Sequence, residues 1–246
     1  MKFYLGTHRP HWLGLLDFPL FVSNRTLSPR RTFPRARAEW ALDSGGFSEL
    51  SMFGDWVTSP AEYVRLTRRY MDEIGKLEWA APQDWMCEPM ILAQTGLSIE
   101  THQLRTIVSY LHLNTIAPDI PWIPVLQGWE LDDYLDHIDQ YARFGIDLTN
   151  LPLVGVGSVC RRQNTDEARE IFEGIHDEGI SIHGFGVKKT GLRAFAHAMA
   201  STDSMAWSFR GRRDPLPTCA HNQCQNCIVF AQKWRLEILQ LIEEAA

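Results

Sequence analysis

The sequence predicts an α/β fold, a (β/α)8 TIM-like barrel that carries a metal-binding loop and a helix at its C-terminal end. Short apolar runs alternate with amphipathic helical stretches along the chain, which is typical of a parallel sheet built from βα units. Eight such units in 246 residues match the size of one closed barrel. We therefore expect a single barrel domain over residues 1–246, with the metal-binding subregion at about 215–246.

The predicted strands are short apolar runs bounded by turn residues. They cover residues 3–5, 20–23, 40–43, 79–81, 123–127, 153–156, 182–185 and 204–208. A helix is predicted to begin at Pro60, because Ser59 can cap it and proline suits its first position. Further helices are predicted at about 99–113, 131–144, 165–178, 190–200 and 229–242, whereas the Arg- and Pro-rich residues 24–39 are expected to form a loop.

Composition limits the class of protein. Hydrophobic content of 45% and charged content of 22% are ordinary for a soluble globular chain. The net charge of −6 argues against a protein that coats nucleic acid without specificity. The sequence has no apolar run long enough for a membrane span, and its N-terminus lacks signal-peptide features, so we expect a cytoplasmic protein with no membrane partner.

Polar side chains and glycines recur where the predicted strands end. In barrels, the carboxyl ends of the strands carry the active site. The most informative of these ends is the run from Asp43 to Phe47, in which an apolar strand delivers a carboxylate and is followed at once by Ser44 and two glycines. The candidate site residues collected in this way are His8, Asp43, Ser44, Gly45, Asp84, Gln127, Gly155, Gly157, Lys188 and Asp203.

The carboxylates among these candidates point to chemistry at a glycosidic carbon. Two carboxylates can share the roles of nucleophile and acid/base there. Gln127 offers a donor and an acceptor, so it can pair with the edge of a nucleobase. The alternative is structural: an aspartate at a strand end can cap a helix or form a turn, and Gln127 can satisfy the backbone of a loop.

Basic residues follow several of the predicted strands. Apart from the arginines of the loop at 24–39, the groups are Arg161 and Arg162, then Lys188, Lys189 and Arg193, and finally Arg210, Arg212 and Arg213. In a barrel they would all project from the face that carries the site, as a polyanionic substrate requires. We expect Arg161, Arg162, Arg210 and Arg212 to contact nucleic acid, although an ordinary solvated surface would use the same residues.

A compact cluster of soft metal ligands follows the last predicted strand. Cys219, His221, Cys224 and Cys227 lie within nine residues, and four Cys or His ligands suit a closed, structural Zn²⁺ site. Cysteines of a cytosolic chain are more often metal ligands than disulfide partners. The alternative is that these cysteines are free thiols. A bound zinc ion would fasten the C-terminal helix to the barrel.

These strand-end motifs and the metal loop together resemble the tRNA-guanine transglycosylase superfamily, and most closely its short phage and bacterial relatives that insert 7-deazaguanine bases into DNA. The family's Asp-Ser-Gly-Gly-Phe stands at 43–47. Its second base-reading aspartate is matched by Asp84, its Val-Gln-Gly by 126–128, and its glycine pair by the region 155–157. Its Met-Gly-Val-Gly-Lys resembles 183–188, and its Cys-x-Cys-x2-Cys loop appears at 219–224 with His221 in place of the middle cysteine.

The resemblance implies that Asp84, Gln127 and the glycines read a base, and that a zinc ion is structural. It leaves the nucleophile open. The family's nucleophilic aspartate lies within strand eight, where the predicted strand of this chain has no carboxylate. Either Asp203, at the start of that strand, or Asp43 takes the role. The family's distant histidine ligand has no match after residue 221, so Cys227 is its natural replacement.

The resemblance predicts exchange of guanine in DNA for a preQ0-like 7-deazaguanine, through a covalent glycosyl-enzyme intermediate. The chain is shorter than the tRNA enzymes and shows no appended RNA-binding module, which favours DNA. The alternatives are exchange in tRNA, a non-catalytic nucleic-acid-binding paralogue and a hydrolytic glycosylase. An oligomer is possible, and the host cytoplasm is the expected location if a phage encodes the chain.

Overall fold

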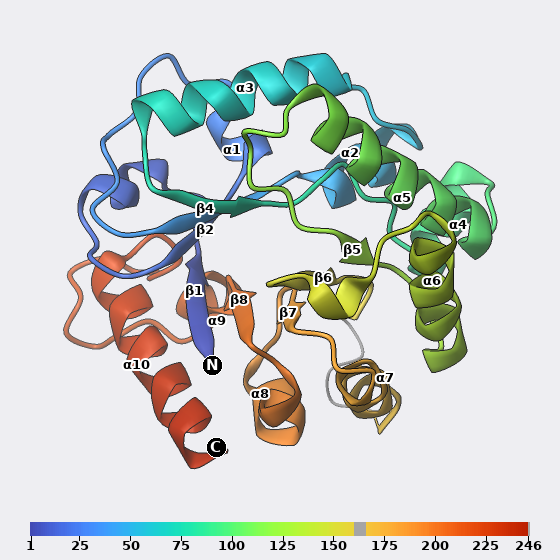
Figure 1. Cartoon of the computed structure of the whole chain (residues 1–246). Helices are drawn as coiled ribbons and strands as arrows, with labels where there is room; N and C mark the ends of the chain where they lie inside the picture. The colour runs from blue at the N-terminus through green and yellow to red at the C-terminus, as the bar shows by residue number, and fades with distance from the viewer. Residues whose placement is uncertain (160–165, 246) are drawn as a thin grey trace.

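The computed structural model describes residues 1–159 and 166–245, which form an α/β barrel (Figure 1). Within these residues eight parallel strands make one curled sheet, with helices in the connections between them. The strands are β1 (Lys2–Gly6), β2 (Leu20–Ser23), β3 (Trp40–Asp43), β4 (Leu77–Ala80), β5 (Val125–Leu126), β6 (Val154–Val156), β7 (Ile182–Gly184) and β8 (Ser201–Ser204).

The order of the strands is that of a (β/α)8 TIM-like barrel. It runs β4-β3-β2-β1-β8-β7-β6-β5, so β4 and β5 stand at the two ends of the hydrogen-bonded sheet. The segment just before β5 joins these ends, because Ala80 and Trp122 form an isolated parallel bridge. The Ala80 N–H donates to the Pro121 carbonyl at 3.0 Å, and the Ile123 N–H donates to the Ala80 carbonyl at 3.1 Å. The predicted barrel is thereby confirmed.

The helices follow the predicted pattern, with additions. They are α1 (Asn24–Leu27), α2 (Gly46–Phe53), α3 (Pro60–Glu73), α4 (Pro89–Thr95), α5 (Ile99–Ile116), α6 (Leu131–Arg143), α7 (Asp166–Asp177), α8 (Lys189–Phe195), α9 (Ala206–Arg213) and α10 (Ile228–Glu244). Short 3-10 turns cover Pro10–Gly14, Leu148–Asn150 and Ala196–Ala198. Ser59 caps α3 as predicted, since its side chain accepts a hydrogen bond from the Glu62 N–H. Residues 24–39 begin with α1 and then continue without regular structure.

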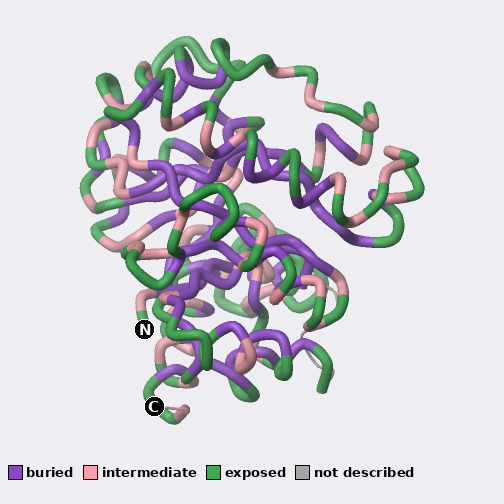
Figure 2. Tube along the Cα trace, turned by 45° about the vertical axis from the view of Figure 1, so that its right-hand side comes forward, coloured by how far each residue is buried: buried purple, intermediate pink, exposed green. Residues whose placement is uncertain are grey.

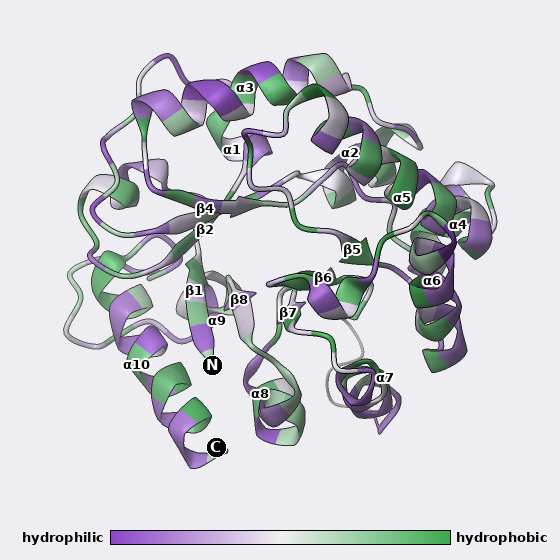
Figure 3. Ribbon diagram, in the orientation of Figure 1, coloured by the Kyte–Doolittle hydropathy of each residue, from purple (hydrophilic) through white to green (hydrophobic). Residues whose placement is uncertain are grey.

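Burial is concentrated in the sheet and on the inner faces of the helices (Figure 2). Hydrophobic and hydrophilic residues alternate around the helices, and α3, α6 and α7 are the most clearly amphipathic (Figure 3). Inside the barrel, Tyr4, Trp79 and Ile123 form a cluster against which Phe21 and Phe185 pack. Burial of each large side chain of this kind stabilises the fold by about 1.5–3 kcal/mol. Because this aromatic layer fills the middle of the barrel, a ligand can enter only from an end.

The eighth strand lies earlier in the sequence than predicted. The prediction placed it at 204–208, whereas β8 spans Ser201–Ser204 and α9 begins at Ala206. Every residue of β8 is buried although none is apolar. Hydrogen bonding compensates for this burial: the Thr202 hydroxyl, for example, donates to the Gly184 carbonyl at 2.7 Å. An apolar pattern therefore could not reveal the strand, and Asp203 lies within it rather than at its start.

The C-terminal helix packs onto the barrel. α10 contacts α8, α9 and β1, and it covers the helix predicted at 229–242. The loop between α9 and α10 holds the predicted metal ligands. Over the described parts of the chain, no helix combines the length and the apolar character that crossing a bilayer requires.

Candidate active site and metal centre

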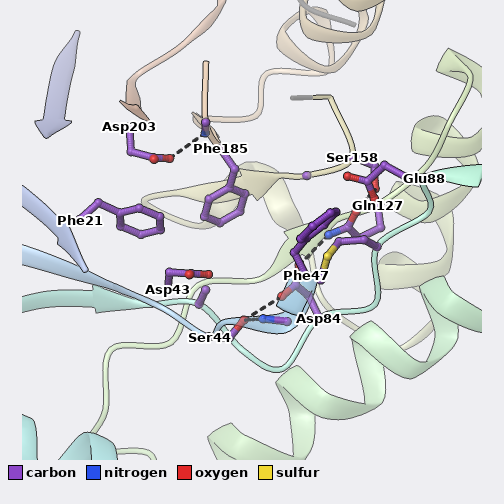
Figure 4. A pocket seen from close by; sticks show the side chains of 15 residues that line it. Phe21, Asp43, Ser44, Phe47, Asp84, Glu88, Gln127, Ser158, Phe185 and Asp203 are labelled. Carbon is purple, nitrogen blue, oxygen red and sulfur yellow. Dashed lines mark hydrogen bonds between the residues drawn. The ribbon is translucent and has the colours of Figure 1, made fainter. Parts of the chain in front are cut away.

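A cavity of about 370 Å³ opens at the carboxyl ends of the strands. β3 contributes Asp43, β8 contributes Asp203, and Gln127 and Gly157 directly follow β5 and β6. Asp84 comes from the loop after β4 (Figure 4). The lining residues are Phe21, Asp43, Ser44, Gly46, Phe47, Ala81, Asp84, Met86, Glu88, Gln127, Gly157, Ser158, Phe185, Gly186 and Asp203. This is the end of the barrel at which the strand-end motifs were expected to meet.

Asp43 and Asp203 occupy the same side of the cavity (Figure 4). Burial raises the pKa of Asp43, and the negative charge of Asp203 raises it further, against hydrogen bonds from Ser23 and from the Gly45 N–H. The Gly45 N–H donates to Oδ1 of Asp43 at 3.1 Å, and the Gly186 N–H donates to Oδ1 of Asp203 at 2.8 Å. Backbone donors therefore orient both carboxyl groups through one oxygen each.

Asp84 lies at the centre of a hydrogen-bonded row on the opposite side. Gln127 donates through Nε2 to its Oδ2 at 2.6 Å, and the Ser44 hydroxyl donates to its Oδ1 at 3.2 Å. Burial raises the pKa of Asp84 to about 7, and the charge of Asp43 adds to the rise, while these two hydrogen bonds oppose it. Near neutral pH the group can therefore hold or release a proton.

Gln127 is held from behind by α6. The His137 Nδ1 accepts from the Gln127 N–H at 2.9 Å, and burial lowers the pKa of His137 to about 3, so this ring is neutral. In front, the Ser158 hydroxyl lies 2.6 Å from Oε1 of Gln127. A Cβ atom on Gly157 would collide with the Gln127 amide, so glycine is needed there. The orientation of the amide is thus fixed before any ligand binds.

Aromatic rings give the cavity flat surfaces. Phe21 and Phe185 line it with their centroids 6.0 Å apart, and Phe47 is 40% exposed at α2. The Phe185 ring occupies the space where a side chain on Gly155 would lie. Flat apolar surfaces beside a row of donors and acceptors suit a planar heterocycle.

The loop between α9 and α10 brings the predicted metal ligands together. The ligand atoms of Cys219, His221, Cys224 and Cys227 all lie within 4.8 Å of one another. The sulfurs of Cys219 and Cys227 are 3.7 Å apart, and the Cys224 sulfur is 3.3 Å from Nε2 of His221. A tetrahedral Zn²⁺ with bonds of about 2.3 Å to sulfur separates two sulfurs by about 3.8 Å. The donor set and its spacing therefore fit zinc.

Comparison with known proteins agrees with this site. The family model DpdA, described as "DeoxyPurine in DNA protein A", matches residues 1–246. The chain belongs to the DpdA family. This is a DNA 7-deazaguanine transglycosylase family of the tRNA-guanine transglycosylase superfamily, so the resemblance predicted from the sequence is confirmed. Membership indicates a transglycosylase that acts on guanine in DNA.

Comparisons outside the family model add little. No curated protein matches the chain. Among solved structures, the chain is similar to the thiamine phosphate pyrophosphorylase from Pyrococcus furiosus, with 14% identity over 97% of this chain and 96% of that one. The TM-score of that match is 0.34, which supports no argument about function.

The structure gathers only part of the predicted site in the DpdA cavity. Asp43, Ser44, Asp84, Gln127, Gly157 and Asp203 line it. Among the described lining residues, His8, Gly45, Gly155 and Lys188 do not appear. Gly45 is instead the N-cap of α2 with a φ of 85°, and Lys188 precedes α8. Gly155 makes room for Phe185, and His8 stacks on Trp207 with its Nε2 2.5 Å from Oδ1 of Asn226.

The predicted DNA-contacting arginines are placed unevenly. Arg212 is exposed on α9. Arg210, on the same helix, forms an ion pair with Glu237 of α10 at 2.9 Å, so part of its charge is already compensated. Arg161 and Arg162 lie outside the described residues.

Several lining residues were not among the predicted site residues. Phe21 and Phe185 had no separate signal, because an aromatic residue at a strand end also fits a core. Ser158 follows the predicted strand at 153–156 and could have been found by its position. In the structure its φ is 59°, which is unusual for a residue other than glycine. Glu88 stands in the loop before α4, which no strand-end pattern reaches.

Proposed function

We propose that the chain exchanges guanine in DNA for a 7-deazaguanine such as preQ0, through a covalent glycosyl-enzyme. The observation that carries this proposal is one cavity in which Asp43 and Asp203 stand on one side and the Asp84–Gln127 pair stands on the other. We also propose that the protein acts on DNA in the cytoplasm, or in the host cytoplasm if a phage encodes it.

The Asp84 side would recognise the base. Guanine and 7-deazaguanine share an edge with two donors, N1–H and the N2 amino group, beside the O6 acceptor. A carboxylate accepts from the donors, and an amide or hydroxyl hydrogen satisfies O6. Asp84, Gln127 and Ser158 offer this set, while Phe185 and Phe47 offer faces for the ring. The target base has to leave the DNA stack to reach them.

The first chemical step would remove guanine. Asp203 attacks C1′ of the deoxyribose through Oδ2, and the C1′–N9 bond breaks as the Asp203–C1′ ester bond forms. The electron pair of the broken bond goes to N9 of guanine. Asp43, whose raised pKa favours its protonated form, gives its proton to the purine. Neutral guanine then leaves the cavity.

The second step would be the reverse reaction with a new base. A 7-deazaguanine binds, and Asp43 removes its N9 proton. N9 then attacks C1′ and the ester bond to Asp203 breaks, which returns a carboxylate. Two displacements at the same carbon retain the configuration of the glycosidic bond. As a result, Asp43 is protonated again for the next cycle.

The Cys219, His221, Cys224 and Cys227 cluster would hold a structural Zn²⁺. A bound ion crosslinks the loop between α9 and α10. Two of the cysteine sulfurs already accept backbone hydrogen bonds. The Leu216 N–H donates to the Cys224 sulfur at 3.3 Å, and the Phe230 N–H donates to the Cys227 sulfur at 3.5 Å. Phe230 belongs to α10, so the cluster ties that helix to the end of α9.

Arg212, Arg161 and Arg162 would contact DNA phosphates.

A base-exchange assay tests the proposal. Purified protein is incubated with preQ0 and either guanine-containing DNA or unmodified tRNA, and the nucleosides are analysed by mass spectrometry. We expect deazaguanine in the DNA alone. Incorporation into tRNA alone, abasic sites without a new base, or binding of DNA with no reaction and no trapped adduct would each replace the proposal with one of the three alternatives.

A further inference from the structure

We infer that His183 is a positioning residue for Asp203, set in one tautomer by Ser201 so that it supports the carboxylate during both displacements. The inference rests on the proposed function, since it assigns Asp203 as the nucleophile. His183 lies in β7 and is fully buried, although the middle of the barrel around it is otherwise aromatic. A buried histidine in such a layer needs a reason.

The surroundings of the ring leave its two nitrogens in different situations. Nδ1 lies 2.8 Å from the Ser201 hydroxyl oxygen. Nε2 is buried and has no hydrogen-bond partner among the residues that the structure describes. The nearest charged atom to it is Oδ1 of Asp203, at 3.5 Å. The parallel pairing of β7 and β8 places His183 opposite Ser201, two residues before Asp203.

Only one neutral tautomer is compatible with both contacts. If Nδ1 carried the hydrogen, the lone pair of Nε2 would face the Asp203 carboxylate, and the two would repel each other. With the hydrogen on Nε2, the ring presents an N–H to Oδ1, and Nδ1 accepts the hydrogen of the Ser201 hydroxyl. Ser201 thereby selects the tautomer that directs an N–H toward Asp203.

The other neighbours of the ring fix its position without competing for this contact. Trp79 and Phe185 pack against it in edge-on geometry, with centroids 4.6 and 4.9 Å away, and Phe21 lies 5.9 Å away. Tyr4 is the titratable group that faces the ring from β1, at 5.8 Å. Burial raises the pKa of Tyr4 well above its ordinary value, so this neighbour stays uncharged. Asp203 is thus the charged partner of His183.

The two oxygens of Asp203 therefore have different roles. The Gly186 N–H donates to Oδ1 at 2.8 Å, and Nε2 of His183 lies 3.5 Å from the same atom. Oδ2 is therefore the oxygen left to form the bond to C1′. When that bond breaks in the second displacement, negative charge returns to the carboxylate, and the donors at Oδ1 stabilise it. Donors placed where charge develops accelerate a reaction more than they strengthen binding.

The inference is tested with His183→Phe, which keeps a flat ring but removes the donor, and with His183→Gln, whose Nε2 can reach the same place. We expect His183→Phe to lower kcat by about 100-fold, the loss typical of one such donor, with KM for DNA and for preQ0 changed by less than about threefold. His183→Gln should recover at least about a tenth of the wild-type rate. Breakdown of the trapped adduct, the step in which negative charge returns to Asp203, should slow more than its formation in His183→Phe.

Two further variants separate positioning from packing. Ser201→Ala should lower kcat about fivefold to tenfold, yet have no effect on top of His183→Phe, because both act through the same contact. Tyr4→Phe, a change in the same aromatic layer, should leave kcat unaltered. Wild-type kcat in a folded His183→Phe protein, or a loss in His183→Gln as large as in His183→Phe, would overturn the inference. Absence of exchange in the wild-type protein would instead overturn the proposed function.

Discussion

The two sides of the cavity are built differently. On the base-reading side, Ser44, Asp84, Gln127 and Ser158 form one continuous hydrogen-bonded row. On the reacting side, one backbone N–H group donates to Oδ1 of each of Asp43 and Asp203, and Ser23 also hydrogen-bonds to Asp43. The base-reading side therefore holds its side chains in fixed positions, which suits recognition of a base. The reacting side keeps carboxylate oxygens available for bond formation and proton transfer.

This difference predicts that substitutions on the two sides have different kinetic effects: those on the reacting side lower the rate, and those on the base-reading side raise KM. The largest effect should come from Asp203→Asn, which removes the nucleophile. Exchange should fall by a factor on the order of 10⁴ or more, and no covalent adduct should form. Asp43→Asn should lose about 10²–10⁴-fold, as expected for an acid/base group, and should still yield an adduct in slow, single-turnover reactions. Rates and denaturing gels of trapped complexes measure both.

Asp177→Asn, at an exposed position of α7, is the matched control and should keep the wild-type rate. An adduct in Asp203→Asn but none in Asp43→Asn would reverse the two roles. The cavity would remain the active site, but the nucleophile would come from β3.

On the base-reading side, Gln127→Leu should act on binding. The substitution removes the donor to Asp84 and the acceptor for Ser158, so the buried carboxyl of Asp84 loses one hydrogen-bond partner. We expect KM for preQ0 to rise by about 10–100-fold while kcat stays within about tenfold. Gln232→Leu, at an exposed position of α10, is the control. A large fall in kcat with an unchanged KM for preQ0 would show that the two sides of the cavity do not differ in this way.

The sequence was informative about this site where chemistry and local pattern coincide. Asp43 ends an apolar strand and is followed by two glycines, so both its position and its neighbourhood were predictable. Asp203 was misplaced because β8 is buried yet polar, and its stability depends on hydrogen bonds to β1 and β7 that no local pattern records. His137 supports Gln127 from another helix, which only the assembled barrel brings together.

A smaller effect should appear in the pH dependence of stability. The pKa of Asp84 is about 7 in the folded protein, raised by burial and then by Asp43 from its ordinary value of 3.8. Between these values the folded state keeps a proton that the unfolded state has released. Stability therefore falls as pH rises through this window, by as much as a few kcal/mol.

Asp84→Asn lacks this proton and should show a flatter profile. Urea unfolding of the wild type, Asp84→Asn and Asp177→Asn at about pH 4.5, 6 and 8 measures the effect. We expect the stability of Asp84→Asn relative to the wild type to increase with pH, and Asp177→Asn to follow the wild type. Parallel curves for all three proteins would mean that Asp84 is ionised throughout, as a purely accepting base reader would be.

The smallest effect should come from a charge on the surface of α9. Arg212 is exposed near the C-terminal end of α9, nine residues after Asp203, so a contact with a phosphate would be made through solvent-screened charge. Arg212→Ala should weaken DNA binding by a few-fold, equally for all sequences, and should reduce the slope of log K against log salt by about 0.9. Arg68→Ala is the control, because Arg68 of α3 pairs at 2.7 Å with Asp119 in the segment that follows α5. An unchanged salt slope for Arg212→Ala would show that DNA approaches the cavity from another side, and the base-reading row would then have to orient the substrate without help from α9.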